Sequence, residues 1–151
     1  MINKRRCIMH VDDDPQMLRV VGHHLAKRGY EVISIDDPRQ AISELVERDC
    51  RVVLLDIDMP HINGLELLAQ IKTHDEGVQA IMLTGLASMT TTLESMRGGA
   101  EACFFKPIDD YEPLLEAIGA TFAKVDRWWS CLEELSDRTR DQKQEIESPL
   151  A

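Results

Sequence analysis

Short apolar runs alternate along the chain with stretches in which apolar residues recur every three or four positions. Five runs have the length and composition of buried strands. They cover 7–11, 30–35, 52–55, 80–83 and 102–105. The stretches between and after them have helical periodicity, and Asp37-Pro38 is expected to cap the second of these helices. The last helix extends from about Asp110 to about Glu147 and is expected to stop at Pro149. This alternation predicts an α/β fold in which helices cover both faces of a five-stranded parallel sheet.

The composition is that of one globular domain with a short appendage. The 151 residues are 44% hydrophobic and 29% charged, and a chain of this length can bury a single core. No apolar run is long enough to span a membrane. The apolar stretch that follows the basic residues at 4–6 is also too short for a signal peptide. We therefore expect a cytoplasmic protein with no membrane partner.

Net charge and cysteine spacing argue against several other classes of site. With 17 basic and 27 acidic residues, the net charge is −10, which disfavours direct nucleic-acid binding. The cysteines at 7, 50, 103 and 131 do not form the closely spaced pairs of zinc or dithiol motifs. Reduced thiols in a cytosol are the expectation.

Polar side chains stand where four of the predicted strands end. Ligands of open parallel sheets bind outside the carboxyl ends of the strands, so these side chains are candidates for one cleft. In chain order they are Asp12 and Asp13, Asp56 and Asp58, Thr84, and Lys106.

The acidic and basic groups of that cleft suit a metal ion and a phosphoryl group. Two carboxylates about 4 Å apart repel each other by about 4 kcal/mol at an effective dielectric of about 20, and a divalent cation removes this repulsion. Oxygen ligands favour Mg²⁺ or Mn²⁺ over zinc. Lys106 and Thr84 could bind phosphoryl oxygens, and a carboxylate could attack phosphorus. An aspartate after a strand is often only a helix cap, so the prediction depends on the joint placement of these residues.

Four segments resemble the receiver domain of bacterial two-component response regulators. They are 8–15 (IMHVDDDP), 52–60 (VVLLDIDMP) with Asn63-Gly64, 81–85 (IMLTG) and 104–107 (FFKP). The resemblance covers about 6–124 and implies a flavodoxin-like sheet with strand order 2-1-3-4-5. It also implies that Asp56 accepts a phosphoryl group from a phosphohistidine of a sensor histidine kinase or a histidine phosphotransfer protein.

The resemblance assigns roles to the other strand-end residues as well. Lys106 would bind the phosphoryl oxygens, and Thr84 would move inward to hydrogen-bond the phosphoryl group. The ligands of Mg²⁺ would be Asp12, Asp13, Asp56 and the backbone carbonyl of Asp58. The chain would then be a stand-alone signalling switch or phosphorelay intermediate that acts on a downstream protein. It would not be an enzyme beyond its own phosphorylation and dephosphorylation.

Three positions differ from the family pattern. The family's switch aromatic stands three residues before the lysine, where this chain has Cys103, and a thiol cannot fill or vacate a pocket as a ring does. Phe104 is adjacent, but it should point to the opposite face of the strand. Asp58 and Leu86 occupy positions at which family members tune the lifetime of the phosphoryl group. His10, within the first strand, is expected to be a packed histidine.

The predicted last helix continues beyond the receiver, and residues 125–151 are interpreted as a C-terminal helical extension of about 30 Å. The apolar positions from Ile118 to Leu132 have heptad spacing, which is typical of a coiled coil. We expect Ile118 and Phe122 to pack on the sheet. Trp129, Leu132 and Leu135 would lie beyond the sheet, so they would need either a partner helix, as in a homodimer, or a tail that folds back.

Two other functions compete with the receiver. A haloacid-dehalogenase-like phosphatase uses an Asp-x-Asp at a strand end, which Asp56 and Asp58 match. Against this alternative, Pro60 is unusual for that family, the motif falls on the third strand, and the acidic residues after the first strand have no role. A scaffold without phosphorylation is the other alternative, and the complete set of strand-end residues argues against it.

Overall fold

Strands and helices alternate along the chain, as predicted. The computed structural model describes residues 6–147. The strands are β1 (Cys7–Val11), β2 (Glu31–Ile35), β3 (Val52–Leu55), β4 (Gln79–Thr84) and β5 (Ala102–Phe105). The helices are α1 (Pro15–Lys27), α2 (Ala41–Arg48), α3 (Gly64–His74), α4 (Met89–Arg97) and α5 (Glu112–Glu147), with a 3₁₀ turn η1 (Pro38–Gln40) before α2.

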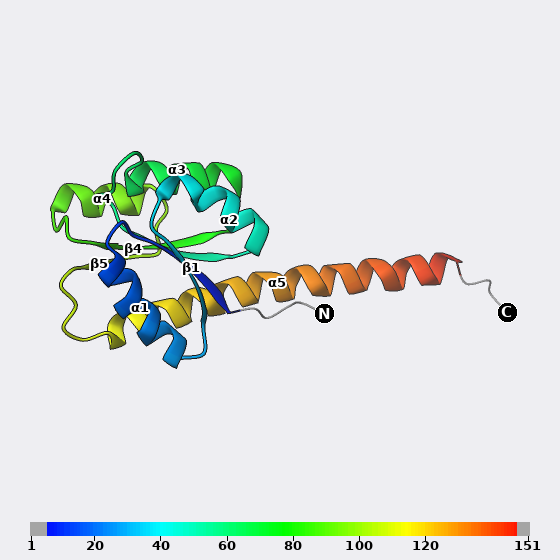
Figure 1. Ribbon diagram of the computed structural model, residues 1–151. Coiled ribbons are helices and arrows are strands. Elements are labelled where there is room, and N and C mark those ends of the chain that lie inside the picture. The colour runs from blue at the N-terminus through cyan, green and yellow to red at the C-terminus, as the bar shows by residue number, and fades with distance from the viewer. Residues whose placement is uncertain (1–5, 148–151) are drawn as a thin grey trace.

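The strands form one sheet in the order β2-β1-β3-β4-β5, and every neighbouring pair is parallel. This is the flavodoxin-like order, so the fold prediction is confirmed. Helices α1 and α5 lie on one face of the sheet, and α2, α3 and α4 lie on the other (Figure 1). The chain moves outward from β1 to β2 and then back to β3. This change of direction opens a crevice at the carboxyl ends of β1 and β3.

Each face of the sheet has its own apolar layer, because successive side chains of a strand point to opposite faces. Met9 and Val11 lie in the layer beneath α2 and α3, whereas Ile8 lies in the layer beneath α1 and α5. All four residues of β3 are fully buried. A strand covered on both faces has no polar alternation, which explains the continuous apolar run in this segment.

Side-chain caps shift two helix starts from their predicted positions. Asp110 Oδ1 accepts a hydrogen bond of 3.0 Å from the backbone N–H of Glu112, so the last helix begins at Glu112. Asp37 caps η1 in the same way, and α2 begins only after this turn, at Ala41. The helix stop that the sequence predicts at Pro149 lies outside the described residues.

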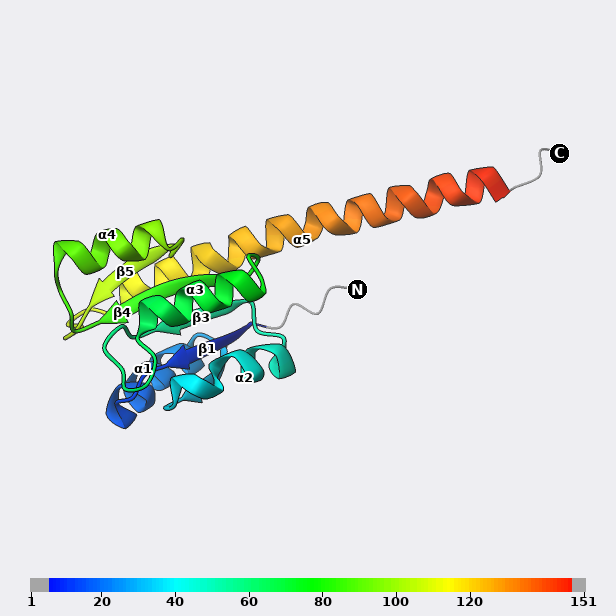
Figure 2. The same cartoon turned by 90° about the horizontal axis from the view of Figure 1, so that it is seen from above.

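Helix α5 continues well past the sheet. Its 36 residues correspond to a length of about 54 Å, and its C-terminal half projects away from the domain (Figures 1 and 2). Because the helix is unbroken from Glu112 to Glu147, the alternative of a folded-back tail is wrong. Among the described residues, no helix is long and apolar enough to cross a membrane.

The first part of the predicted extension packs against the domain. Ile118 and Phe122 are buried on the sheet, as predicted. Val125 is buried too, and Trp129 packs against the same apolar layer, with the Arg51 guanidinium 4.7 Å from its ring centroid. The expectation that Trp129 needs a partner helix is therefore wrong. The boundary between 6–124 and 125–151 stays a prediction.

The exposed apolar side chains of α5 form a different seam from the predicted one. Trp128, Leu132 and Leu135 are 67%, 54% and 60% exposed, and Ile146 is 84% exposed. We call these four residues the seam. They share one stripe of the helix: Leu132 and Leu135 follow Trp128 in steps of four and three residues, and Ile146 lies eleven residues further on, beyond the polar Thr139 and Gln142. The seam therefore contains Trp128 in place of Trp129.

Candidate functional site

The carboxyl ends of β1 and β3 bring three carboxylates together. Oxygen atoms of Asp12, Asp13 and Asp56 all lie within 4.8 Å of one another. Asp12 and Asp56 are buried, whereas Asp13 is exposed. An all-oxygen donor set with one side open to solvent suits a hard divalent cation such as Mg²⁺.

The loop after β3 holds Asp56 through close backbone contacts. The backbone N–H of Asp56 donates to the carbonyl of Val11 at 3.0 Å, and the N–H of Gly64 donates to the carbonyl of Ile57 at 2.8 Å. A Cβ atom at Gly64 would lie 1.9 Å from the carbonyl oxygen of Asp56, so only glycine fits there. Asn63 caps α3 beside it, which accounts for the Asn-Gly pair of the sequence motif.

Lys106 reaches the acidic cluster from β5. Its Nζ atom lies 2.7 Å from Asp12 Oδ2 and 3.4 Å from Asp56 Oδ2. Burial lowers the pKa of Lys106, but the hydrogen bond to Asp12 and the charge of Asp56 outweigh burial, so the pKa is raised. Burial raises the pKa of Asp56, and Lys106 offsets part of this effect. The structure thus joins Lys106 to both buried carboxylates.

Thr84 and Asp58 lie at the margin of the cluster. Thr84 is buried, and its Oγ1 accepts a hydrogen bond of 3.1 Å from the backbone N–H of Leu86. The backbone carbonyl of Thr84 accepts a hydrogen bond of 2.9 Å from the Lys106 N–H, but among the described residues the Thr84 hydroxyl forms none with Asp56 or with the Lys106 side chain. The Asp58 side chain is exposed and is not part of the carboxylate cluster. The metal-binding role of its backbone carbonyl therefore stays a prediction.

His10 lies directly beneath the cluster, a position that the sequence analysis did not identify. The histidine is fully buried, which confirms that it is packed, and its Nε2 atom is 3.9 Å from Asp12 Oδ2. Burial lowers the pKa of His10 to about 4, so the ring is neutral at pH 7. Neither ring nitrogen has a hydrogen-bond partner. In the sequence, this residue is marked as unusual because it is a histidine inside an otherwise apolar strand.

Cys103 and Phe104 point to opposite faces of β5, as predicted. Cys103 packs in the layer beneath α2 and α3, and Phe104 in the layer beneath α1 and α5. Burial raises the pKa of the Cys103 thiol. A partly buried thiol therefore stands where the family has its switch aromatic, and Phe104 does not replace that ring.

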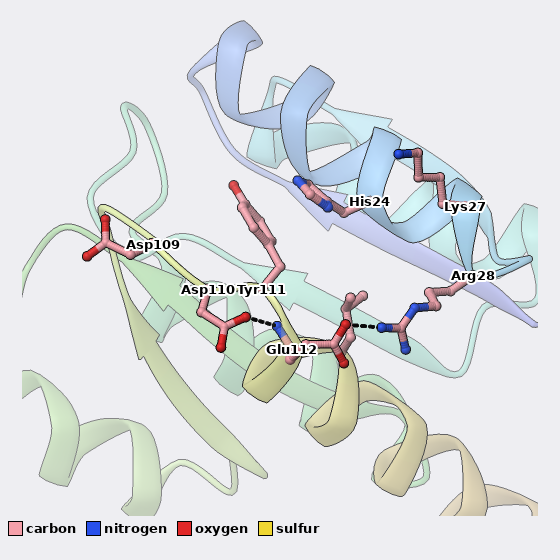
Figure 3. Close-up of a pocket in the computed structure, with 8 residues that line it drawn as sticks. His24, Lys27, Arg28, Asp109, Asp110, Tyr111 and Glu112 are labelled. Carbon is pink, nitrogen blue, oxygen red and sulfur yellow. Dashed lines mark hydrogen bonds and ion pairs between the residues drawn. The ribbon is translucent and has the colours of Figure 1, made fainter.

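A hollow of about 370 Å³ lies between the C-terminal part of α1 and the loop that leads into α5 (Figure 3). Within it, His24 stacks on Tyr111 with ring centroids 3.9 Å apart, and Arg28 forms an ion pair with Glu112. Its lining residues are His24, Lys27, Arg28, Asp109, Asp110, Tyr111, Glu112 and Leu115. None of these residues belongs to the carboxylate cluster, so the hollow is a separate surface feature.

Residues 8–119 match the family described as "Response regulator receiver domain", and the match covers well over half of the chain. The chain belongs to this receiver domain family. Receiver domains are signal-transduction modules of two-component systems, and the residues of the carboxylate cluster fall within the matched part of the chain. The phosphatase alternative finds no support in these comparisons.

Known proteins resemble this receiver domain in sequence and in structure. The C4-dicarboxylate transport transcriptional regulatory protein DctD of Pseudomonas aeruginosa is 32% identical over 111 residues, which are 74% of this chain and 24% of DctD. The chain thus spans about a quarter of that relative's length. A CheY-like receiver domain protein from Methanospirillum hungatei has 30% identity and a TM-score of 0.75, with 80% of this chain and 96% of that chain covered. TrrA of Thermotoga maritima, in complex with Mg²⁺ and BeF, has 26% identity and a TM-score of 0.70, with 76% and 97% covered.

Proposed function

We propose that this receiver domain is a phosphorylation switch in which Asp56 is the phosphoacceptor. The proposal rests on the convergence of three carboxylates and one lysine at the carboxyl edge of the sheet. An Oδ atom of Asp56 would attack the phosphorus of a phosphohistidine. The nitrogen–phosphorus bond would break, and an acyl phosphate would form on Asp56.

The neighbouring side chains suit the charge of that product. Lys106 stays protonated, and its Nζ atom is already 3.4 Å from Asp56, so it would hold a phosphoryl oxygen through a charge-assisted hydrogen bond. Thr84 is bonded to the loop before α4. If its hydroxyl turned toward the phosphoryl group, the loss of the Leu86 hydrogen bond would transmit phosphorylation to that loop.

We further propose that Asp12, Asp13, Asp56 and the backbone carbonyl of Asp58 hold Mg²⁺, and Mn²⁺ suits the same oxygen ligands. When bound, the cation would neutralise the phosphoryl oxygens. The close approach of three carboxylates supports this, because one lysine cannot balance three negative charges. The complex of TrrA with Mg²⁺ and BeF supports the same assignment.

The phosphodonor would be a sensor histidine kinase or a histidine phosphotransfer protein, and the signal would pass to a downstream protein. The net charge of −10 argues against DNA as the direct target. The transcriptional role in the name of DctD belongs to a protein of which the match covers only 24%, so we do not assign that output to this chain.

Intact mass spectrometry with acetyl phosphate and Mg²⁺ tests the phosphoacceptor. The wild-type chain should gain one phosphoryl group, and Asp56→Asn should gain none. Asp58→Asn is the matched control, because it removes a nearby carboxylate outside the cluster and should still be labelled. Full labelling of Asp56→Asn on another residue would contradict the assignment.

Thermal unfolding tests the cation. Mg²⁺ should raise the melting temperature of the wild-type chain by mass action, since the unfolded chain lacks the site. Asp13→Ala should abolish this rise, while Asp14→Ala, whose carboxylate caps α1, should retain it. An equal rise in Asp13→Ala and the wild type would show that Asp13 is not a ligand.

We also propose that the exposed seam of α5 binds a second copy of this chain. Trp128, Leu132, Leu135 and Ile146 share one stripe of a helix that projects from the domain. The steps of four and three residues from Trp128 to Leu135 are those of a coiled-coil seam. Burying each of these side chains is worth roughly 1.5–3 kcal/mol, against an association cost of at least about 4 kcal/mol. The sum favours a dimer at micromolar concentration.

Sedimentation velocity on the full chain tests self-association. The wild type should shift from monomer to dimer as its concentration rises, and Leu132→Glu with Leu135→Glu should remain a monomer. The control is Glu133→Gln, an exposed substitution outside the seam. A wild type that stays monomeric at every concentration would contradict the proposal.

A further inference from the structure

Cys7 and Cys50 are brought together although 43 positions separate them in the sequence. Cys7 opens β1, and Cys50 lies between α2 and β3, the strand that pairs with β1. Their Sγ atoms are 2.6 Å apart, and both side chains are buried, with 2% exposure. A disulfide bond has a sulfur–sulfur distance of about 2.05 Å, so a small movement would bring the pair to bonding distance.

The residue next to each cysteine holds helix α5 where it leaves the domain. Arg6 precedes Cys7, lies over the Phe122 ring at 5.6 Å and forms an ion pair of 3.8 Å with Asp126. Arg51 follows Cys50 and lies over the Trp129 ring at 4.7 Å. We call residues 122–129 the root of α5. Two segments therefore hold this root. The thiol pair joins the same two segments on the opposite face of the sheet, in the layer beneath α2 and α3.

We propose that Cys7 and Cys50 form a redox-sensitive pair whose disulfide links the two segments that hold the root of α5. The oxidant would be hydrogen peroxide. One cysteine sulfur attacks a peroxide oxygen, the oxygen–oxygen bond breaks, and one water leaves as a sulfenic acid forms. The second sulfur then attacks the sulfenic sulfur, a second water leaves, and the sulfur–sulfur bond forms. Two electrons pass from the sulfurs to the peroxide.

The surroundings of Cys50 determine which oxidant can reach the pair and how fast. Cys50 lines a surface hollow of about 150 Å³ between α2 and the end of α3, which is large compared with the roughly 30 Å³ of one water. A peroxide molecule fits there, whereas a bulky disulfide would have to displace packed side chains. Burial and the neighbouring thiol raise the pKa of Cys50, so little thiolate is present at pH 7. Oxidation should therefore be slow and should accelerate with rising pH.

Peptide mapping after peroxide treatment tests the disulfide. The experiment uses full-length chain with Cys103→Ser and Cys131→Ser, which leaves the pair intact and removes the other two thiols. Oxidation should lower the intact mass by two hydrogen atoms, protect both cysteines from alkylation after denaturation, and yield one linked peptide pair that a reductant separates. Two alkylatable thiols, or sulfinic acid without a linked peptide, would overturn the proposal.

The same sample tests the effect on the helix and needs no substitution at the buried pair. The oxidised chain should melt higher than the reduced chain, on the order of 10 °C, because the disulfide restricts the unfolded state. Amide exchange at 122–129 should slow severalfold, with exchange at 130–147 unchanged. Unchanged exchange at the root despite a formed disulfide would overturn the link to α5.

Discussion

The two ends of the sheet hold charged groups in opposite ways. At the carboxyl edge, Asp12 and Asp56 are buried around Lys106, so removing Lys106 would leave two buried carboxylates without their positive partner. At the amino edge, Arg6 and Arg51 lie at the surface and bind α5 through aromatic rings and an exposed ion pair. The first arrangement suits chemistry that changes charge, and the second suits a contact that can loosen without unfolding the domain.

The largest expected effect is at the carboxyl edge. Gly64→Ala should lower the free energy of unfolding by about 3 kcal/mol, because its Cβ would overlap the carbonyl oxygen of Asp56. Urea denaturation measures the change. Gly85→Ala is the matched control, since nothing lies within 4 Å of its Cβ position. Equal stability of the two variants would show that the loop after β3 moves freely and does not fix Asp56.

The next effect distinguishes the two tryptophans of α5. Trp129→Ala should lower the free energy of unfolding by about 2 kcal/mol, since a partly buried ring and its Arg51 contact are lost. Trp128→Ala should change it by less than about 0.5 kcal/mol, because that ring is exposed. Both measurements use protein concentrations below those at which the chain is expected to dimerise. The reverse order would place Trp128 in the root and Trp129 in the seam.

A smaller change in the free energy of unfolding, of opposite sign, is expected at His10, which lies beneath the carboxylates. His10→Leu should raise the free energy of unfolding by about 1 kcal/mol, because it removes two buried nitrogens that have no hydrogen-bond partner. His74→Leu, at an exposed position, is the control and should be neutral. If His10→Leu is instead destabilising, the imidazole contributes a favourable interaction with Asp12.

The smallest effect is expected at the amino edge. Arg6→Gln should lower the free energy of unfolding by less than about 1 kcal/mol, because its ion pair with Asp126 is exposed and 3.8 Å long. The loss should shrink further at high salt. Chemical denaturation at two salt concentrations measures both. If Arg6→Gln lowered the free energy of unfolding as much as Gly64→Ala, the contrast between buried charges at the carboxyl edge and surface charges at the amino edge would be wrong.

The carboxyl edge could be predicted because its residues occupy fixed places in a repeating pattern. Asp12, Asp56 and Lys106 each follow an apolar strand, and parallel strands deliver such residues to one edge. His10 could be assigned to the core, but its position below Asp12 depends on strand register. The register is fixed by pairs such as His10 with Leu54, which periodicity does not reveal.

The amino edge could not be predicted from local pattern. Arg6 and Arg51 resemble solvated residues in the sequence, and only the folded sheet brings both onto α5. The same contacts explain the error at Trp129. Heptad spacing identifies the apolar faces of a helix, but it does not show where the domain ends. The contact between Cys7 and Cys50 likewise depends on β1 pairing with β3.

The length of α5 turns a small rotation into a large displacement. Residues 130–147 add about 27 Å beyond Trp129, the last described residue of α5 that packs in the apolar layer. For a rigid rod of that length, a tilt of about 10° at its base moves the far end by about 5 Å, close to one helical turn. A displacement of about 1 Å across the roughly 10 Å root at 122–129 corresponds to a tilt of about 5°, which would move the far end of the helix sideways by about 2.5 Å. The position of the far end of α5 is therefore determined by the contacts that hold its root at the amino edge of the sheet.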